Sequence, residues 1–237
     1  MLVLAIESSA AAASAALFED GRLVAECFAD NGLIHSRTLM PLVERVLSIG
    51  EKKPGSLGAV AVAQGPGSFT GLRIGMAGAI GMAEALGIPC VGISTLEGCA
   101  RQLAVADGVI CPVLDARRGY VYNALFRSRK GAVERITEDR MIEAAALSQE
   151  IKEFSNNLVF LVGDGAVLCY NTIIQYDFVR LAPAHLLMQR ASGIGLAAVD
   201  RLSDPAFSPA PVKPVYLRMC QAERELREKK KIRQKDE

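Results

Sequence analysis

A glycine-rich segment at residues 65–75, with the sequence GPGSFTGLRIG, has residue types that could bind an anion. It follows an apolar run at residues 57–63, predicted as a buried strand, and precedes residues 72–86, predicted as a helix. A glycine-dense turn at this place leaves backbone N–H groups free to face a phosphate, or another chain, at the helix N-terminus. The segment lacks the Lys-Ser/Thr pair with which a Walker motif grips phosphate. The candidate nucleotide-binding residues of this segment are Gly65, Gly67 and Ser68.

Acidic residues follow two other apolar runs, and a glycine pair follows a third. Glu7-Ser8 comes after residues 2–6, Asp115 after residues 109–114, and Gly-Asp-Gly after residues 158–162. Two acids on facing strands could hold a metal ion or a water molecule, and a Gly-x-Gly turn leaves backbone room for an adenosine. Acids and glycines are common at strand ends, so ordinary turns remain the alternative. The candidate nucleotide-binding residues here are Glu7, Ser8, Asp115, Gly163 and Gly165.

The histidines and cysteines are too few and too scattered to indicate a metal centre. The two histidines, His35 and His185, lie far apart in the sequence, and the six cysteines include no Cys-x-x-Cys pair. This distribution argues against a zinc ribbon and against a disulfide framework, and it suits a reducing compartment. We therefore predict no metal ligand and expect both histidines to be packed or on the surface.

The composition, 51% apolar and 22% charged, is typical of a compact globular protein. A formal net charge of +1 provides no general attraction to nucleic acid or to anionic membranes, so tight tRNA binding by this chain alone is not expected. The apolar N-terminal run lacks a basic region and soon meets Glu7, so it predicts neither a signal peptide nor a membrane anchor. These features predict a soluble cytoplasmic protein.

The hydrophobic pattern predicts two α/β halves around a cleft. Each half opens with an apolar strand that ends in an acid and continues into a hairpin, which indicates a faint internal duplication. We predict an N-terminal lobe at 1–104, a C-terminal lobe at 105–220 and a charged tail at 221–237. This order is typical of the two-lobed actin/Hsp70-like (ASKHA) ATPase fold, in which each lobe is a mixed sheet with helices. The predicted strands are residues 2–6, 14–18, 22–28, 57–63, 88–93, 109–114, 120–126, 131–136 and 158–162, and the predicted helices are residues 36–49, 72–86, 95–104, 147–154 and 185–201.

Two predicted helices of the first half carry a surface suited to another protein. In residues 36–49 apolar side chains recur with a helical period, and Pro41 is compatible with a straight helix only if it begins near Thr38. In residues 72–86 each glycine would destabilise an isolated helix by about 1 kcal/mol, yet the smooth face lets another helix approach closely. The alternative is that both helices only cover their own sheet. The predicted partner-interface residues are Leu39, Met40, Val43, Val46, Gly71, Ile74, Gly75, Gly78, Gly81, Met82 and Ala85.

The motifs together resemble those of the bacterial TsaB (YeaZ) family, over nearly all of the chain up to residue 218. The string at 65–75 is highly specific for that family. The family usually has Asp at the position of Glu7, whose longer side chain would fill the same cleft. Supporting motifs are Ile-Glu-Ser-Ser at 6–9, His35-Ser36 ahead of Leu39-Met40-Pro41, Gly-Ile-Ser-Thr-Leu at 92–96, DARRGYVY at 115–122 and PVYLR at 214–218.

The resemblance implies an accessory, non-catalytic role in making threonylcarbamoyladenosine in tRNA. Family members are relatives of the catalytic TsaD subunits and dock on TsaD through helices of the first half. TsaD would transfer the threonylcarbamoyl group to the adenosine next to the anticodon. Catalytic relatives carry a His-x-x-x-His metal pair where this chain has Thr95 and Cys99, so the resemblance implies no catalytic metal and no catalytic residue here.

The expected partners are TsaD, the ATPase TsaE in the same assembly, and a second copy of the chain when TsaD is absent. Contact with tRNA is expected to be indirect or weak, and no membrane contact is expected. A protein of another class remains the alternative: an ATPase or transferase in its own right, using Glu7, Asp115 and the 65–71 loop, with ATP or ADP in the cleft. Turnover of ATP by the purified chain separates the two hypotheses.

Overall fold

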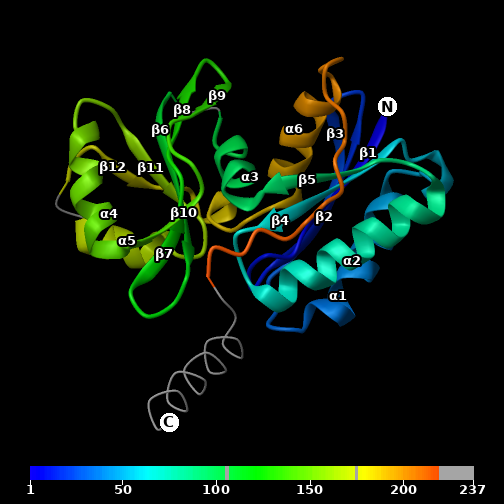
Figure 1. The fold of residues 1–237 in the computed structure, drawn as a ribbon, viewed down its shortest axis with the longest axis horizontal. Coiled ribbons are helices and arrows are strands. Elements are labelled where there is room, and N and C mark those ends of the chain that lie inside the picture. Colours follow the sequence, from blue (N-terminus) through cyan, green and yellow to red (C-terminus); the bar gives the residue numbers. More distant parts are fainter. Residues whose placement is uncertain (105–106, 174–175, 219–237) are drawn as a thin grey trace, which may run out of the picture.

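The structure is a computed structural model that describes residues 1–104, 107–173 and 176–218. The charged tail predicted at 221–237 lies outside the described residues. The chain forms two β-sheets, each with its own helices, in two adjacent lobes (Figure 1). None of the helices within the described ranges combines the length and the apolar character needed to cross a membrane.

The first sheet has five strands in the order β3-β2-β1-β4-β5. Strands β1 to β3 form an antiparallel meander, and β4 and β5 add in parallel to β1 through two helices. The elements are β1 (Leu2–Glu7), β2 (Ala13–Glu19), β3 (Arg22–Ala29), α1 (His35–Ile49), β4 (Ala59–Gly65), α2 (Phe69–Leu86) and β5 (Cys90–Ser94), with the 3-10 turn η1 (Pro54–Ser56) before β4.

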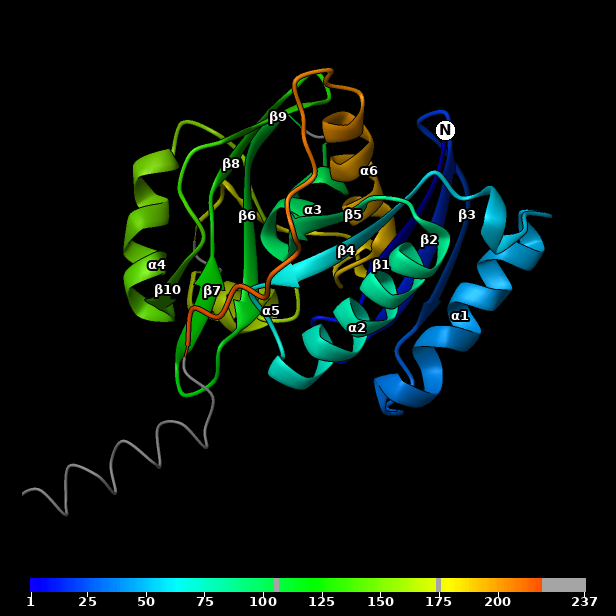
Figure 2. The same cartoon turned by 45° about the vertical axis from the view of Figure 1, so that its right-hand side comes forward.

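Strand β1 is buried on both faces, which explains its unbroken apolar sequence. Successive side chains of a strand point to opposite faces. Leu4 and Ile6 therefore join the core under α1 and α2, while Val3 and Ala5 join the core under α6 (Ala191–Leu202). The first sheet is thus covered by α1 and α2 on one face and by α6 on the other (Figure 2).

The second sheet has the order β10-β7-β6-β11-β12, with β8 and β9 forming a hairpin that pairs to the other end of β6. Helices α4 and α5 cover one face, and α3 covers the other while also packing on α6. The elements are α3 (Thr95–Arg101), β6 (Gly108–Asp115), β7 (Tyr120–Asn123), β8 (Phe126–Arg129), β9 (Ala132–Arg135), β10 (Arg140–Glu143), α4 (Ala144–Glu150), β11 (Val159–Val162), α5 (Ala166–Ile173) and β12 (Val179–Leu181).

The single strand predicted at 120–126 is two strands, and Pro112 in β6 explains the break. Strand β7 pairs with residues 113–115 of β6, and β8 pairs with residues 108–110. Between these two ladders Pro112 has no N–H to donate, so the backbone hydrogen bonds are interrupted there, although the register is the same on both sides. The Asn123 side chain instead donates a hydrogen bond of 2.9 Å to the Pro112 carbonyl.

Other predicted elements shift at their ends or were missed. Helix α2 begins at Phe69 because the Ser68 hydroxyl accepts a hydrogen bond from the Gly71 N–H at 3.3 Å, a cap that starts the helix earlier than predicted. Helix α1 begins at His35, so Pro41 lies inside it. The helix predicted at 147–154 is α4 followed by the 3-10 turn η2 (Ile151–Phe154), and the helix predicted at 185–201 is the 3-10 turn η3 (Ala184–Leu186) followed by α6. The short elements β10, α5 and β12 were not predicted.

The C-terminal part of the chain returns to the first lobe. Helix α6 packs on the first sheet although it follows the second sheet in sequence. From its end, residues 203–218 run alongside β5 and β4 and reach the second lobe (Figures 1 and 2). The Val215 N–H donates a hydrogen bond of 2.7 Å to the Gln64 carbonyl on the way. The first lobe is therefore completed by residues distant in sequence, and the lobe bounds expected at 1–104 and 105–220 stay a prediction.

Candidate functional site

A cavity of about 520 Å³ lies between the two lobes. It is lined by the loop after β1, the N-terminal end of α2, the loop after β6, and the last described residues of the C-terminal segment. Of the predicted nucleotide-binding residues, Gly67, Ser68 and Asp115 line this cavity. The cavity therefore contains candidate residues from both lobes, but only part of the predicted set.

Glu7 is buried and does not line the cavity. One carboxylate oxygen, Oε1, accepts a hydrogen bond of 2.6 Å from the Ser9 N–H, and Oε2 has no partner among the described residues. Burial raises the pKa of Glu7 to about 7. Hydrogen bonds from the Ser9 side chain and from the Ser8 and Ser9 backbone act in the opposite direction and lower this pKa, but burial has the larger effect. At neutral pH this side chain is therefore only partly ionised.

The two aspartates of the second lobe are engaged by neighbouring groups. Asp115 accepts a hydrogen bond of 2.7 Å from the Arg117 N–H and pairs with the Arg117 guanidinium at 3.1 Å. Asp164 accepts hydrogen bonds from the Asp115 N–H at 3.2 Å and from Gln189 at 3.1 Å. Burial raises the pKa of the Asp164 carboxyl above its ordinary value. Asp164 lines the cavity, although the sequence drew attention only to the glycines on either side of it.

Three predicted nucleotide-binding glycines are explained by close packing within the chain. A side chain at Gly65, whose φ is +117°, would collide with the Val215 carbonyl of the C-terminal segment. Side chains at Gly163 and Gly165 would collide with the backbone at the end of β6. The space at these glycines is thus filled by the protein's own backbone, and their contact with a nucleotide stays a prediction. Ser8 is also engaged, since its hydroxyl donates a hydrogen bond of 2.9 Å to the Gly71 carbonyl.

The predicted partner surface on α1 and α2 divides into a buried part and an accessible part. The expectation of an accessible surface is corrected for Leu39, Val43 and Val46, because these side chains point into the core under the first sheet. Gly71 and Gly75 are likewise buried, and a side chain at either would collide with Ser8. The predicted interface residues that are exposed or half-buried are Met40, Ile74, Gly78, Gly81, Met82 and Ala85.

Two of the accessible glycines are not required by the packing of this chain. A Cβ at Gly78 would lie 3.6 Å from the Met40 sulfur, which is an ordinary contact. A Cβ at Gly81 would have no neighbour within 4 Å. Met40 itself is 40% exposed. The middle of the outer face of α2, with Met40 of α1 beside it, is therefore smooth and open, and the exposed charged residues Arg73 and Glu84 lie towards its two ends.

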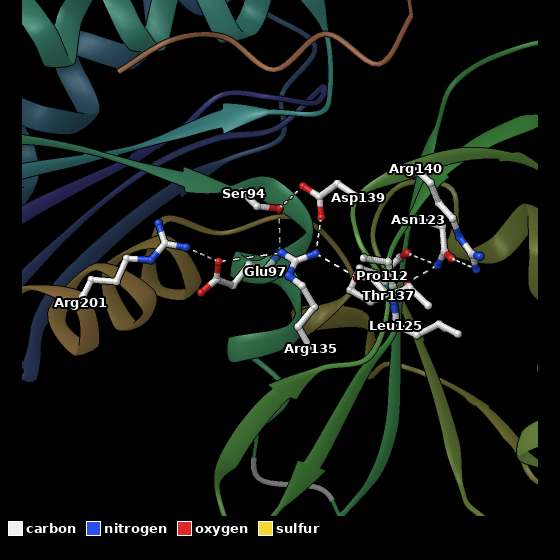
Figure 3. Close-up of polar contacts among 11 residues, drawn as sticks. Ser94, Glu97, Pro112, Asn123, Leu125, Arg135, Thr137, Asp139, Arg140 and Arg201 are labelled. Carbon is white, nitrogen blue, oxygen red and sulfur yellow. Dashed lines mark hydrogen bonds and ion pairs between the residues drawn. The ribbon is translucent and has the colours of Figure 1, made fainter. Parts of the chain in front are cut away.

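A polar network, shown in Figure 3, joins the two lobes and was not predicted. Glu97 of α3 forms ion pairs with Arg201 of α6 and, at 3.9 Å, with Arg135 of β9. Arg135 also donates a hydrogen bond of 2.6 Å to Asp139, which accepts a second one of 2.6 Å from the Ser94 hydroxyl. The only sequence signal was the acid at the start of a helix, since Ser94 caps α3 and Glu97 lies in its first turn.

Thr95 and Cys99, which the resemblance places where catalytic relatives would carry a metal pair, are buried. Thr95 and Cys99 lie one turn apart on α3, and burial raises the pKa of the Cys99 thiol well above its usual value. No group of three or more His, Cys, Asp or Glu side chains within the described ranges could hold a metal ion. Of the two histidines, His35 contacts the Ala10 carbonyl through Nε2 at 2.6 Å, and His185 lies in η3.

Comparisons with known proteins agree with the motifs. The family model described as "TsaD: tRNA N6-adenosine threonylcarbamoyltransferase" matches residues 33–199. The Bacillus subtilis protein named "tRNA threonylcarbamoyladenosine biosynthesis protein TsaB" is 31% identical over 226 residues, which cover 94% of this chain and 96% of that protein. The Escherichia coli protein of the same name is 31% identical over 168 residues, covering 70% of this chain and 72% of that protein.

Solved structures show the same fold. A structure described as "YeaZ from Pseudomonas aeruginosa" matches with a TM-score of 0.74 at 24% identity, covering 91% of this chain and 99% of that one. A ROK hexokinase from Thermus thermophilus matches with a TM-score of 0.51 at 12% identity, covering 86% of this chain and 100% of that one. The predicted two-lobed, actin-like α/β fold is thereby confirmed. With a relative of near-equal length at 31% identity, the chain belongs to the TsaB family, within the wider group that the TsaD model describes.

Proposed function

We propose that this chain acts with TsaD in forming threonylcarbamoyladenosine next to the anticodon of tRNA, as an accessory subunit and not as an enzyme. The observation that carries the proposal is the 31% identity to the Bacillus subtilis TsaB over nearly the whole length of both proteins. That relative is named for the biosynthesis of this modified nucleoside.

The state of the acidic residues supports an accessory role. An ATPase that uses a divalent metal needs carboxylates that are ionised and free to face the ion or its waters. Here Glu7 is buried with a pKa raised by burial to about 7, and Asp115 is paired with Arg117. The chain also has Thr95 and Cys99, both buried, where the resemblance places the metal pair of the catalytic relatives. These features favour a partner over an independent ATPase or transferase.

We assign the docking surface for TsaD to the outer face of α2 with Met40 beside it. The accessible residues Ile74, Gly78 and Gly81 offer a surface with short side chains, so a helix of the partner could lie close to the backbone of α2. Packing against such a partner would offset the helix destabilisation that the glycines cause. In the absence of TsaD a second copy of the chain would cover the same face. TsaE would join the assembly in the cytoplasm, and tRNA would be contacted mainly through the partners.

Co-purification with TsaD tests this assignment through Gly81→Leu. Because a Cβ at Gly81 meets nothing within 4 Å, the variant should fold, and its thermal stability should not decrease. We expect it to lose most of its binding to TsaD, since the new side chain prevents close approach of a helix. The matched control is Gly55→Leu, which places the same side chain at another open position of the first lobe. Normal TsaD binding by Gly81→Leu would show that the surface is assigned to the wrong face.

A further inference from the structure

The C-terminal segment, residues 203–218, contacts the cores of both lobes. Phe207 packs against the core between the first sheet and α6, and Val212 packs against the core under α1 and α2. Leu217, a few residues beyond Val212, packs against the core of the second lobe that α3 covers. The segment therefore crosses from one lobe to the other within its last described residues, and Figure 2 shows this path.

The segment fits closely against the glycine-rich turn before α2. The Val215 N–H donates a hydrogen bond of 2.7 Å to the Gln64 carbonyl. At Gly65, whose φ is +117°, a Cβ would lie 2.5 Å from the Val215 carbonyl oxygen. Only glycine tolerates both this φ and this close approach. The first glycine of the turn is thus explained by a residue far along the chain.

Tyr216 contacts the first turns of α2. Its ring centroid lies 4.8 Å from that of Phe69, and its hydroxyl accepts a hydrogen bond of 3.0 Å from Nε of Arg73. The Arg73 guanidinium also lies 3.8 Å from the Phe69 centroid, so it stacks on the same ring. These contacts direct the Arg73 side chain toward the N-terminal end of α2, away from Gly78 and Gly81. The segment is thereby joined to the helix that carries the assigned docking surface.

Arg218 joins the same segment to the second lobe. Its guanidinium donates hydrogen bonds to the carbonyls of Ala116 and Arg117, in the loop after β6 at residues 116–119. Tyr216 and Arg218 are two positions apart, and two residues of extended chain span about 7 Å. The contact with α2 and the contact with this loop are therefore linked by a very short tether.

The segment is held mainly by side chains. Among the described residues, 208–218 take part in a single backbone–backbone hydrogen bond, the one that Val215 donates. The three prolines at 209, 211 and 214 have no N–H to donate. A stretch with so few backbone hydrogen bonds opens locally at a low free-energy cost, whereas core strands open only at a high one. The segment can therefore detach while both lobes stay folded.

We propose that the C-terminal segment is a releasable strap that couples the docking helix α2 to the loop after β6 in the second lobe. When it is attached, the strap orders both the glycine-rich turn and that loop. When it is released at either end, both become looser. A partner that orders α2 would therefore also order the loop after β6, although it touches only the first lobe. This last consequence rests on the function proposed above, whereas the strap is a property of the chain alone.

Hydrogen exchange of the full chain tests the strap through Arg218→Ala. Within the described ranges Arg218 donates hydrogen bonds only to the second lobe. We nevertheless expect the variant to exchange about fivefold faster both at residues 115–120 and at residues 65–73 of the first lobe, because the loss of these hydrogen bonds releases the whole strap. Strands β1 and β11 should exchange as in the wild type, since both lobes remain folded. Unchanged exchange at 65–73 would overturn the proposal.

Two further variants separate the strap from local loosening. Tyr216→Ala releases the strap at its other end, and because Tyr216 is 37% exposed the fold should persist. We expect about fivefold faster exchange at residues 115–120, which Tyr216→Ala would leave unchanged if the two ends were independent. The matched control is Arg118→Ala, which removes the same side chain as Arg218→Ala from an exposed position of the loop after β6. It should leave the exchange at 65–73 as in the wild type.

The effect of TsaD on exchange tests the coupling. We expect TsaD to slow exchange at residues 115–120 in the wild type by about threefold or more, and to have no such effect in Arg218→Ala. Equal slowing in both proteins would indicate that TsaD contacts this loop directly, and it would overturn the coupling. Gly81→Leu should lose TsaD binding but keep the wild-type exchange at both segments without TsaD. A wrong docking surface and a wrong strap therefore give different results.

Discussion

The hydroxyl of Ser94 donates a hydrogen bond of 2.6 Å to Asp139, and this bond connects the end of the first sheet to the second lobe (Figure 3). The same hydroxyl accepts a hydrogen bond of 3.3 Å from the Glu97 N–H and so caps α3. One side chain therefore fixes both the start of the helix between the lobes and the loop that faces it.

The double role of Ser94 predicts a large effect of Ser94→Ala on stability. We expect the variant to lose about 1–3 kcal/mol of unfolding free energy, because it removes a helix cap and leaves Asp139 with one partner fewer. Urea denaturation of the full chain measures this. The control is Ser203→Ala, whose exposed hydroxyl donates only to the Val199 carbonyl and whose loss should cost about 0.5 kcal/mol or less. Equal stability of the two variants would contradict the role assigned to Ser94.

The buried carboxyl of Glu7 predicts a pH dependence of stability. Burial raises its pKa from 4.5 to about 7, so the folded state holds a proton that the unfolded state releases between these values. The unfolding free energy should therefore fall as the pH rises from 4.5 through 7, by a total on the order of 2–3 kcal/mol. In Glu7→Gln this part of the pH dependence should disappear, and the variant should be more stable than the wild type at about pH 8. Urea denaturation across this pH range measures both effects, and parallel curves for the two proteins would show that Glu7 is not the group responsible.

Two glycines of α2 should respond to alanine in opposite ways. Gly75→Ala should lower the unfolding free energy by about 1–3 kcal/mol, because the new methyl group would collide with the Ser8 hydroxyl. Gly81→Ala should raise it by up to about 1 kcal/mol, because the position is open and alanine favours a helix. Thermal or urea unfolding measures the difference, and a change of the same sign in both variants would disagree with this placement of α2.

The acidic residues of the cleft already interact with neighbouring groups of the protein. This predicts that the purified chain does not hydrolyse ATP. With Asp115 paired to Arg117, we expect phosphate release with ATP and Mg²⁺ to remain at the background level, and Asp115→Ala to leave it unchanged. A phosphate-release assay on the chain alone provides the measurement. Hydrolysis above background that disappears in Asp115→Ala would instead establish an enzyme that uses the cleft.

The strands and helices of the first lobe could be predicted from the sequence, because each depends on a pattern of neighbouring residues. The apolar run that became β1 and the glycine-rich turn before α2 each lie within a few consecutive residues. The break between β7 and β8 was not accessible in this way. It depends on Pro112, which meets the broken strand only after β6 has paired with it.

Sequence by itself determined the family and the two-lobed fold, since the string at 65–75 is specific and the succession of strands and helices along the chain follows from apolar runs and turns. Tertiary structure alone decided which apolar residues are covered. Helical periodicity placed Leu39, Met40 and Val43 together, but only packing on the first sheet buries Leu39 and Val43 and leaves Met40 outside. The charge state of the cleft was decided in the same way, because the pairing of Asp115 and the burial of Glu7 depend on neighbours that folding brings near them.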